Sequence, residues 1–215
     1  ILYCIFFFSP LLADNVNIQS LSISIDKKTK ITIFKNQVVA RDIANNQLFT
    51  EFAEYNKDLQ ILKTVGKTTV ITSNGYIVEG DDFIFDNSKN YIRSTNPAII
   101  EDLENNFLFL DNFEYSTSKG LFKSFGNISV VDSKENKYNF SQIYVDEKKK
   151  EIVGTDAKTF LNEDSFKTNQ KNKPRIFSNT VNIYDEKTKF TKSIFTLCDY
   201  REGDKCPPWS LQAKE

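Results

Sequence analysis

Apolar and polar residues alternate along most of this chain, and the alternation recurs every thirty residues. Blocks with apolar side chains two positions apart begin at the same spacing: Ile23–Asp26, Ala53–Asn56, Phe83–Asp86, Phe113–Ser116 and Ile143–Asp146. A second column continues downstream through Leu62, Ile92, Phe122 and Ile152, and a third through Asn36–Ala40, Gly66–Val70, Asn96–Ile100 and Gly126–Val130. A period of two is typical of half-buried strands, so the sequence predicts a repeated array of strands.

The segments between these blocks are rich in turn-forming and charged residues. Asp26–Lys30, Asp86–Lys89 and Asp146–Lys150 each open with an aspartate, which can accept hydrogen bonds from the backbone just ahead and favours a tight turn. Each unit is therefore predicted to be a strand-turn-strand block.

The parity of the apolar positions changes inside each unit. In the first part of each unit the apolar residues stand at even-numbered positions, as at Leu48, Val78, Leu108 and Tyr138. In the second part they stand at odd-numbered positions, as at Ala53, Phe83, Phe113 and Ile143. A one-residue slip turns every side chain to the other face, so a bulge or sheet corner near residues 50–53 and their equivalents would restore the pattern. The alternative is two separate strands with a loop between them. The run Ile99–Phe113 matches the strand columns and is predicted as strand rather than helix.

Composition supports a β fold without a charged partner. The chain has 215 residues with 19 Phe, 9 Tyr and only 7 Gly, and its aromatic and β-branched residues favour a pleated surface. With 28 basic and 29 acidic residues, its net charge of −1 predicts neither nucleic-acid binding nor electrostatic attraction to a membrane surface.

The two ends of the sequence differ from the repeats. Residues 1–13 are apolar and resemble the core of a secretory signal, with cleavage after Ala13, although a core strand is the alternative. The repeats occupy residues 14–161. Residues 162–197 are predicted to form a polar loop and further strands, and residues 198–215 form a Cys/Pro/Trp segment.

Catalytic and metal-binding motifs are not convincing. The chain has no histidine, which removes the commonest general base and metal ligand. Gly66–Thr69 resembles the end of a phosphate-binding loop, but it belongs to a repeat column and Ile61 stands where an earlier glycine is required. Asp81 with Asp82, and Asp102 with Glu104, are interpreted as turn charges rather than acid-base pairs. We therefore expect no enzyme activity, cofactor or metal.

Cys198 and Cys206 are the cysteines outside the first thirteen residues, and their spacing does not suit a zinc site. A disulfide, internal or to another segment, fits an exported protein better.

Together these columns resemble the OstA-like repeats of periplasmic lipopolysaccharide-transport proteins over roughly Val16–Leu161. The segment from Cys198 through Cys206-Pro207-Pro208-Trp209 to Ala213 is similar to the one that precedes the outer-membrane barrel in the LptD family. The resemblance implies an all-β fold, a bent antiparallel β-jellyroll or β-taco, with an apolar groove for the acyl chains of lipopolysaccharide. Its lining is predicted to be Val70, Phe83, Phe85, Phe113, Tyr115, Phe122, Ile128, Val130, Ile143 and Ile152.

The same resemblance implies location and partners. The protein would be exported to the periplasmic face of the outer membrane of a Gram-negative cell. It would pair edge strands with an LptA-like bridge protein, pass lipopolysaccharide to a barrel that follows residue 215, and meet an LptE-like lipoprotein through that barrel. Whether Cys198 and Cys206 bond each other or the barrel is left open. The alternatives are a free LptA-like bridge protein and an extracellular β-solenoid enzyme or adhesin.

Overall fold

The computed structural model describes residues 16–162, 174–184, 187–198 and 209–214, and strands dominate this part of the chain. The strands are β1 (Asn17–Gln19), β2 (Ser22–Asp26), β3 (Ile31–Arg41), β4 (Gln47–Asn56), β5 (Ile61–Thr64), β6 (Lys67–Ile71), β7 (Ile77–Asp81), β8 (Ile84–Asp86), β9 (Tyr91–Ser94), β10 (Ala98–Glu101), β11 (Phe107–Leu110), β12 (Phe113–Ser116), β13 (Leu121–Val131), β14 (Lys137–Asp146), β15 (Glu151–Phe160), β16 (Arg175–Tyr184), β17 (Lys187–Thr196) and β18 (Leu211–Ala213). Within the described ranges the helical structure is a short 3₁₀ turn, Asn87–Lys89. The predicted all-β class is confirmed, and β10, β11 and β12 occupy the run Ile99–Phe113.

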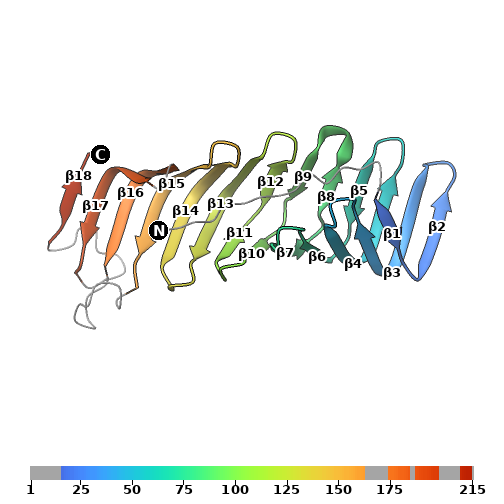
Figure 1. Ribbon diagram of the computed structural model, residues 1–215, viewed down its shortest axis with the longest axis horizontal. Coiled ribbons are helices and arrows are strands. Elements are labelled where there is room, and N and C mark those ends of the chain that lie inside the picture. The colour runs from blue at the N-terminus through green and yellow to red at the C-terminus, as the bar shows by residue number, and fades with distance from the viewer. Residues whose placement is uncertain (1–15, 163–173, 185–186, 199–208, 215) are drawn as a thin grey trace.

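All strands belong to one antiparallel sheet that extends from β2 at one end to β18 at the other (Figure 1). The sheet is bent into two walls. Wall A contains β2, β5, β8, β9 and β12, and wall B contains β1, β6, β7, β10, β11 and β18. The long strands β3, β4, β13, β14, β15, β16 and β17 cross from one wall to the other, and their two halves pair in different walls. The fold is thus a bent antiparallel β-jellyroll. Each crossing of the chain from one wall to the other, here called a pass, stacks on the one before it.

The bend between the walls lies where the apolar parity changes. The pairing of β3 with β4 shifts register between Lys35 and Val38, and that of β13 with β14 shifts between Phe125 and Ile128. Opposite these bulges, the buried face of β4 changes from Thr50 to Ala53. The predicted corner is therefore present. The alternative of two separate strands is also present, because β7 and β8, and β11 and β12, are distinct strands on either side of the corner.

The thirty-residue repeat is visible in the backbone as columns of positive φ. The turns that border wall A place it at Lys30, Gln60, Asn90, Gly120 and Lys150, and those that border wall B place it at Asn45, Gly75, Asn105 and Glu135. A third column runs along the corner through Asn36, Gly66, Gly126 and Asp156. In the two columns of turns, the left-handed conformation occurs where the chain reverses, at the same position of successive units.

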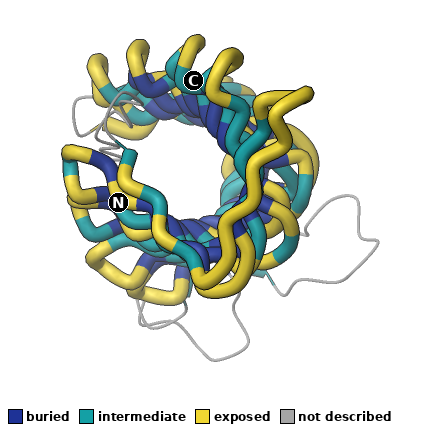
Figure 2. The backbone as a smooth tube through the Cα atoms, turned by 90° about the vertical axis from the view of Figure 1, so that its right-hand side faces the viewer, coloured by how far each residue is buried: buried dark blue, intermediate teal, exposed yellow. Residues whose placement is uncertain are grey.

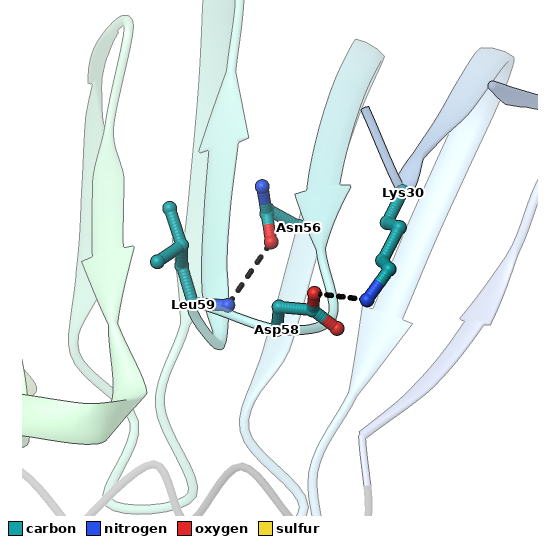
Figure 3. Close-up of polar contacts among 4 residues, drawn as sticks. All are labelled: Lys30, Asn56, Asp58 and Leu59. Atoms are coloured by element: carbon teal, nitrogen blue, oxygen red, sulfur yellow. Dashed lines mark hydrogen bonds and ion pairs between the residues drawn. The ribbon is translucent and has the colours of Figure 1, made fainter. Parts of the chain in front are cut away.

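The wall A turns are held by aspartate and asparagine side chains, as their sequences predict. Asn56 Oδ1 accepts a hydrogen bond from the Leu59 backbone N–H at 3.0 Å, and Asp26 Oδ1 accepts one from Lys28 at 2.8 Å. Neighbouring turns are also joined, because Lys30 Nζ lies 2.6 Å from Asp58 Oδ2 (Figure 3). This exposed ion pair adds little stability, but it aligns two successive turns.

Viewed along the stack, the backbone surrounds a central space, with buried positions facing inward and exposed turns projecting outward (Figure 2). Side chains fill this space. Two glycines show how tightly: a Cβ on Gly80 would lie 2.8 Å from Phe83 Cε1 and 2.9 Å from the Pro97 carbonyl oxygen, and one on Gly154 would lie 2.6 Å from Phe140 Cδ1. Small residues on one pass make room for aromatic rings on another, as close-packed interiors require.

Candidate functional site: the apolar interior

The ten residues predicted to line a groove all lie on the inner face, and all are buried. Their exposed fractions run from 1% to 9%. Phe85, Phe113, Tyr115, Phe122, Ile143 and Ile152 belong to wall A, Val70, Ile128 and Val130 to wall B, and Phe83 lies at the corner. The repeat columns thus converge on one interior, while their contact with lipid stays a prediction.

Aromatic rings form the centre of this interior. Phe83 packs edge-on against Phe113 with ring centroids 5.5 Å apart, and Phe113 stacks on Phe122 at 6.1 Å. Edge-to-face and offset pairs of this kind add about 0.5–1.5 kcal/mol each beyond the area they bury. Phe83 lies between β7 and β8, Phe113 on β12 and Phe122 on β13, so the cluster runs along the stack rather than across it.

Among the described residues, a void of about 20 Å³ lies between wall A and wall B near β4 and β6. It is lined by Ala40, Leu48, Leu62, Val70 and Phe85. A space of this size holds about one water molecule. An acyl chain could enter beside these residues only if the walls moved apart.

Several polar groups that reach the interior are satisfied locally, whereas the buried Ser178 hydroxyl has no hydrogen-bond partner among the described residues. At the corner, Thr68 Oγ1 lies 2.8 Å from Thr64 Oγ1, Ser94 Oγ donates to the Asp81 carbonyl oxygen at 3.1 Å, and Ser124 Oγ donates to that of Asn112 at 2.6 Å. The Tyr115 hydroxyl reaches the Glu147 carboxylate at 2.9 Å, and burial together with this charge raises the pKa of the tyrosine. The buried charged residues, Asp42, Asp86, Asp132 and Arg175, lie in turns or at strand ends. The inner face therefore presents an apolar surface to anything that enters it.

A ladder of asparagines borders wall B, and the sequence predictions did not include it. Asn136 Nδ2 donates to Asp132 Oδ2 at 2.8 Å within one turn, and Asn136 Oδ1 accepts from the Asn162 backbone N–H at 2.8 Å in the next. Asn46 and Asn106 make the same pair of contacts. The signal was present as an Asp-x-x-x-Asn spacing that recurs with the repeat. The ladder ties wall B turns to one another, just as Lys30 and Asp58 tie turns of wall A.

The hydrogen bonds assigned between described turn residues join turns of the same wall. Thr117 of wall A bonds to Asn90 of wall A, and Ser133 of wall B bonds to Asn106 of wall B. Strand pairing connects the walls through the corner. This arrangement resembles a hinge along the corner with two independently fastened rims.

The outer face of wall A carries an ionic row instead of an apolar one. Glu114 forms an ion pair with Lys123, its neighbour across the β12–β13 pairing. The hydrogen bond from Lys123, together with one from Tyr91, lowers the pKa of the Glu114 carboxyl despite partial burial. This face is suited to solvent, so the two faces of wall A differ sharply in chemistry.

Both ends of the stack expose inward-facing apolar residues. Ile23 pairs with the inward-facing Phe34 and is 55% exposed, because β2 has a strand neighbour on one side only. At the other end, Leu211 on β18 is 59% exposed. Unpaired edges that carry apolar side chains favour pairing with a further strand.

The turn charges considered as acid-base pairs have structural partners. Asp82 Oδ1 accepts from the Gly66 backbone N–H at 2.7 Å, and Asp102 Oδ1 accepts from that of Glu104 at 2.8 Å. Gly66 itself lies at the corner with a φ of 75°. Gly66 is therefore part of the bend between β5 and β6, and the three residues after it begin β6.

Several predictions concern residues outside the described ranges. These include the apolar segment 1–13, most of the polar loop after Asn162, and Cys206. Cys198 Sγ lies 3.5 Å from the Trp209 carbonyl oxygen, and β18 pairs with β17 just beyond this tryptophan. The disulfide stays a prediction.

Comparisons with known proteins give little guidance. No protein-family profile matches the chain, and no curated protein matches it. A similar solved structure is LptH from Pseudomonas aeruginosa, described as the LptA homologous periplasmic component of the conserved lipopolysaccharide transport device. It is 11% identical with a TM-score of 0.30, and the match covers 68% of this chain and 85% of LptH. A TM-score this low supports no conclusion about fold or function.

Within the described residues, no helix has the length and apolar character needed to cross a bilayer.

Proposed function

We propose that this protein carries lipopolysaccharide by its acyl chains between walls A and B, as the periplasmic part of an outer-membrane lipopolysaccharide assembly protein. The observation that carries the proposal is the continuous apolar inner face, repeated in register from β3 to β17. Each buried methylene is worth roughly 0.8 kcal/mol, so acyl chains would gain from leaving water for such a surface. Many similar positions along the stack suit movement better than one deep pocket does.

Entry would occur between the two rows of turns. The turns of each wall form hydrogen bonds with turns of the same wall, and in the described part of the chain strand pairing joins the two walls only through the corner. Separating the two rows of turns therefore breaks few hydrogen bonds. Acyl chains would then replace the contacts that the two walls make with each other. Because the chains fill space that side chains occupy in the closed form, the net gain per methylene is smaller than the transfer value.

The exposed edge at β2 would receive an LptA-like bridge protein by strand addition. Ile23 and Ile25 would continue the inner face into the partner, whose own apolar face would cover them. By the sequence resemblance, an LptE-like lipoprotein belongs to the outer-membrane side, and Cys198 would form a disulfide either with Cys206 or with the barrel.

A free periplasmic bridge of the LptA kind is the second candidate, favoured by the strand edges at both ends of the stack. The coding sequence beyond Glu215 separates the two. A long series of further amphipathic strands would support the assembly protein, whereas a stop within a few dozen codons would support the bridge.

Photo-crosslinking tests the acyl-chain route. A benzophenone amino acid at Phe85 or Phe122 should form adducts with lipopolysaccharide in cells, since both positions face the interior. The same residue at Phe125, which lies on the outer face of β13, is the matched control and should form few. Adducts at neither interior position, or equal adducts at Phe125, would overturn the proposal.

A further inference from the structure

A groove of about 700 Å³ crosses the outer face of wall B, on the opposite side of the sheet from the apolar interior. Its floor includes a straight row of outward-facing residues, one from each of five adjacent strands. In cross-strand order they are Ile99, Phe109, Ser129, Asn139 and Lys158.

The chemistry of this row changes from one end to the other. Ile99 and Phe109 are each 39% exposed, and the Phe109 ring lies at 26° to that of Phe107 with centroids 6.4 Å apart. The other end carries a hydroxyl, an amide and an ammonium group, from Ser129, Asn139 and Lys158. Among the described residues, none of these three side chains has a hydrogen bond or ion pair.

The polar groups at the rim of the groove are different, because they are already engaged. Asp111 Oδ2 accepts hydrogen bonds from the Asn127 backbone at 2.8 Å and side chain at 3.0 Å. Asp156 Oδ2 accepts one from Ser141 Oγ at 2.5 Å. The rim is thus held in place, while the floor keeps unused donors and acceptors.

Folding does not require an aromatic residue on this face. Thirty residues earlier, the Ile99–Phe109 pair is replaced by Thr69 and Glu79, which pair across the strands and lie 3.3 Å apart through Oγ1 and Oε1. The sheet therefore also forms with a hydrogen-bonded polar pair at this position. Phe49 stands in the same column sixty residues earlier, so the fold accepts an aromatic residue here in some units without requiring it, and packing does not explain why Phe109 is half-exposed.

We propose that this groove binds a saccharide, with one pyranose ring over Phe109 and the next rings over Ser129, Asn139 and Lys158. The face of an aromatic ring is negative and attracts the C–H edges of a sugar. Hydroxyl, amide and ammonium groups supply donors and acceptors for sugar hydroxyls. Strands lie about 4.8 Å apart, close to the width of one pyranose, so the row presents one side chain to each ring. The volume falls in the range of ligand sites, about 300–1,000 Å³.

Two saccharide probes without acyl chains test the site and distinguish two sources of the saccharide. One is the oligosaccharide released from rough lipopolysaccharide by mild acid, and the other is a trimer of N-acetylglucosamine, which represents peptidoglycan. Each is titrated into the full chain and followed by ¹H–¹⁵N NMR. Shifts confined to the floor of the groove with the first probe would assign it to the sugar part of the lipid, and with the second to the cell-wall glycan.

Phe109→Ala should weaken binding of the active probe at least tenfold, and Asn139→Ala should weaken it severalfold. Phe49→Ala is the matched control, because Phe49 pairs with Thr69 in the same outer row but lies outside the groove. It should bind as the unchanged protein does. Absence of binding for both probes at millimolar concentration, or unchanged binding by Phe109→Ala, would overturn the proposal. Since neither probe has acyl chains, this result is independent of crosslinking at Phe85 and Phe122.

Discussion

Gly154→Ala should destabilise the protein through a clash in its interior. The added Cβ would lie 2.6 Å and 2.7 Å from Phe140 Cδ1 and Cε1, well inside ordinary contact distance. Gly154 is buried on β15 and, unlike Gly66, does not have a positive φ, so the cost is steric rather than conformational. Phe140 is 7% exposed and has little room to move.

Overpacking of this kind costs about 1–3 kcal/mol. For a chain of this length, each kcal/mol corresponds to a change in melting temperature of about 2–4 °C. Far-UV circular dichroism during thermal and urea unfolding measures the change. Gly66→Ala is the control: nothing lies within 4 Å of its Cβ, but its φ of 75° makes alanine cost about 1–2 kcal/mol through backbone strain.

A second substitution separates the two mechanisms. Phe140→Leu shortens the side chain that Gly154→Ala meets, so the double variant should be more stable than the sum of the single effects predicts. The coupling should be about 0.5–3 kcal/mol, as for residues in contact. Phe140→Leu combined with Gly66→Ala should be additive. If Gly154→Ala unfolds like the unchanged protein, or if its effect adds simply to that of Phe140→Leu, the packing described for the interior is wrong.

Two further substitutions address the turns and the outer face. Asn136→Ala removes both contacts of a buried ladder residue and should cost about 2–3 kcal/mol in urea unfolding, while Lys134→Ala in the same turn should change little; equal effects would contradict the ladder. Lys123→Gln should raise the pKa of Glu114 in a carboxyl-detected NMR titration, because Lys123 is the main cause of its lowered value. A lowered folded-state pKa stabilises the fold above the ordinary carboxyl value, about 4.3, and this contribution is lost as the pH falls through the folded pKa. The variant should therefore lose less stability on acidification over that range, and an unchanged Glu114 titration would show that the ion pair does not form in solution.

The repeat columns predicted the strands and the inner face because both follow from side-chain period. Phe83, Phe113 and Ile143 recur every thirty residues on one parity, and a sheet with one buried face must place them inside. The change of parity between Thr50 and Ala53 likewise predicted the corner. In these cases the apolar pattern is local and recurs in every unit, so an atypical residue in one unit does not obscure the prediction.

Other features could not be predicted for physical reasons. Lys30 and Gln60 adopt positive φ although neither residue favours it, because the stacking of turns outweighs local preference. The closing of the walls on Phe85 and Phe122 depends on how two faces pack, which the period of one chain segment does not encode. The outer groove is not repeated in every unit, since the column through Phe49, Glu79, Phe109 and Asn139 alternates between aromatic and polar residues. The repeated positions therefore predict the fold, whereas the proposed saccharide site lies at positions that differ between units.

The thirty-residue unit comprises two passes of the chain, each hydrogen-bonded to its neighbours. Since strands are about 4.8 Å apart, duplication or loss of one unit would change the length of the stack by about 10 Å and leave every surviving interface intact. The length of the stack is thus set by the number of repeats. A change in the number of units would therefore alter the reach of the protein in fixed steps while the strand pairing within each retained unit stayed the same.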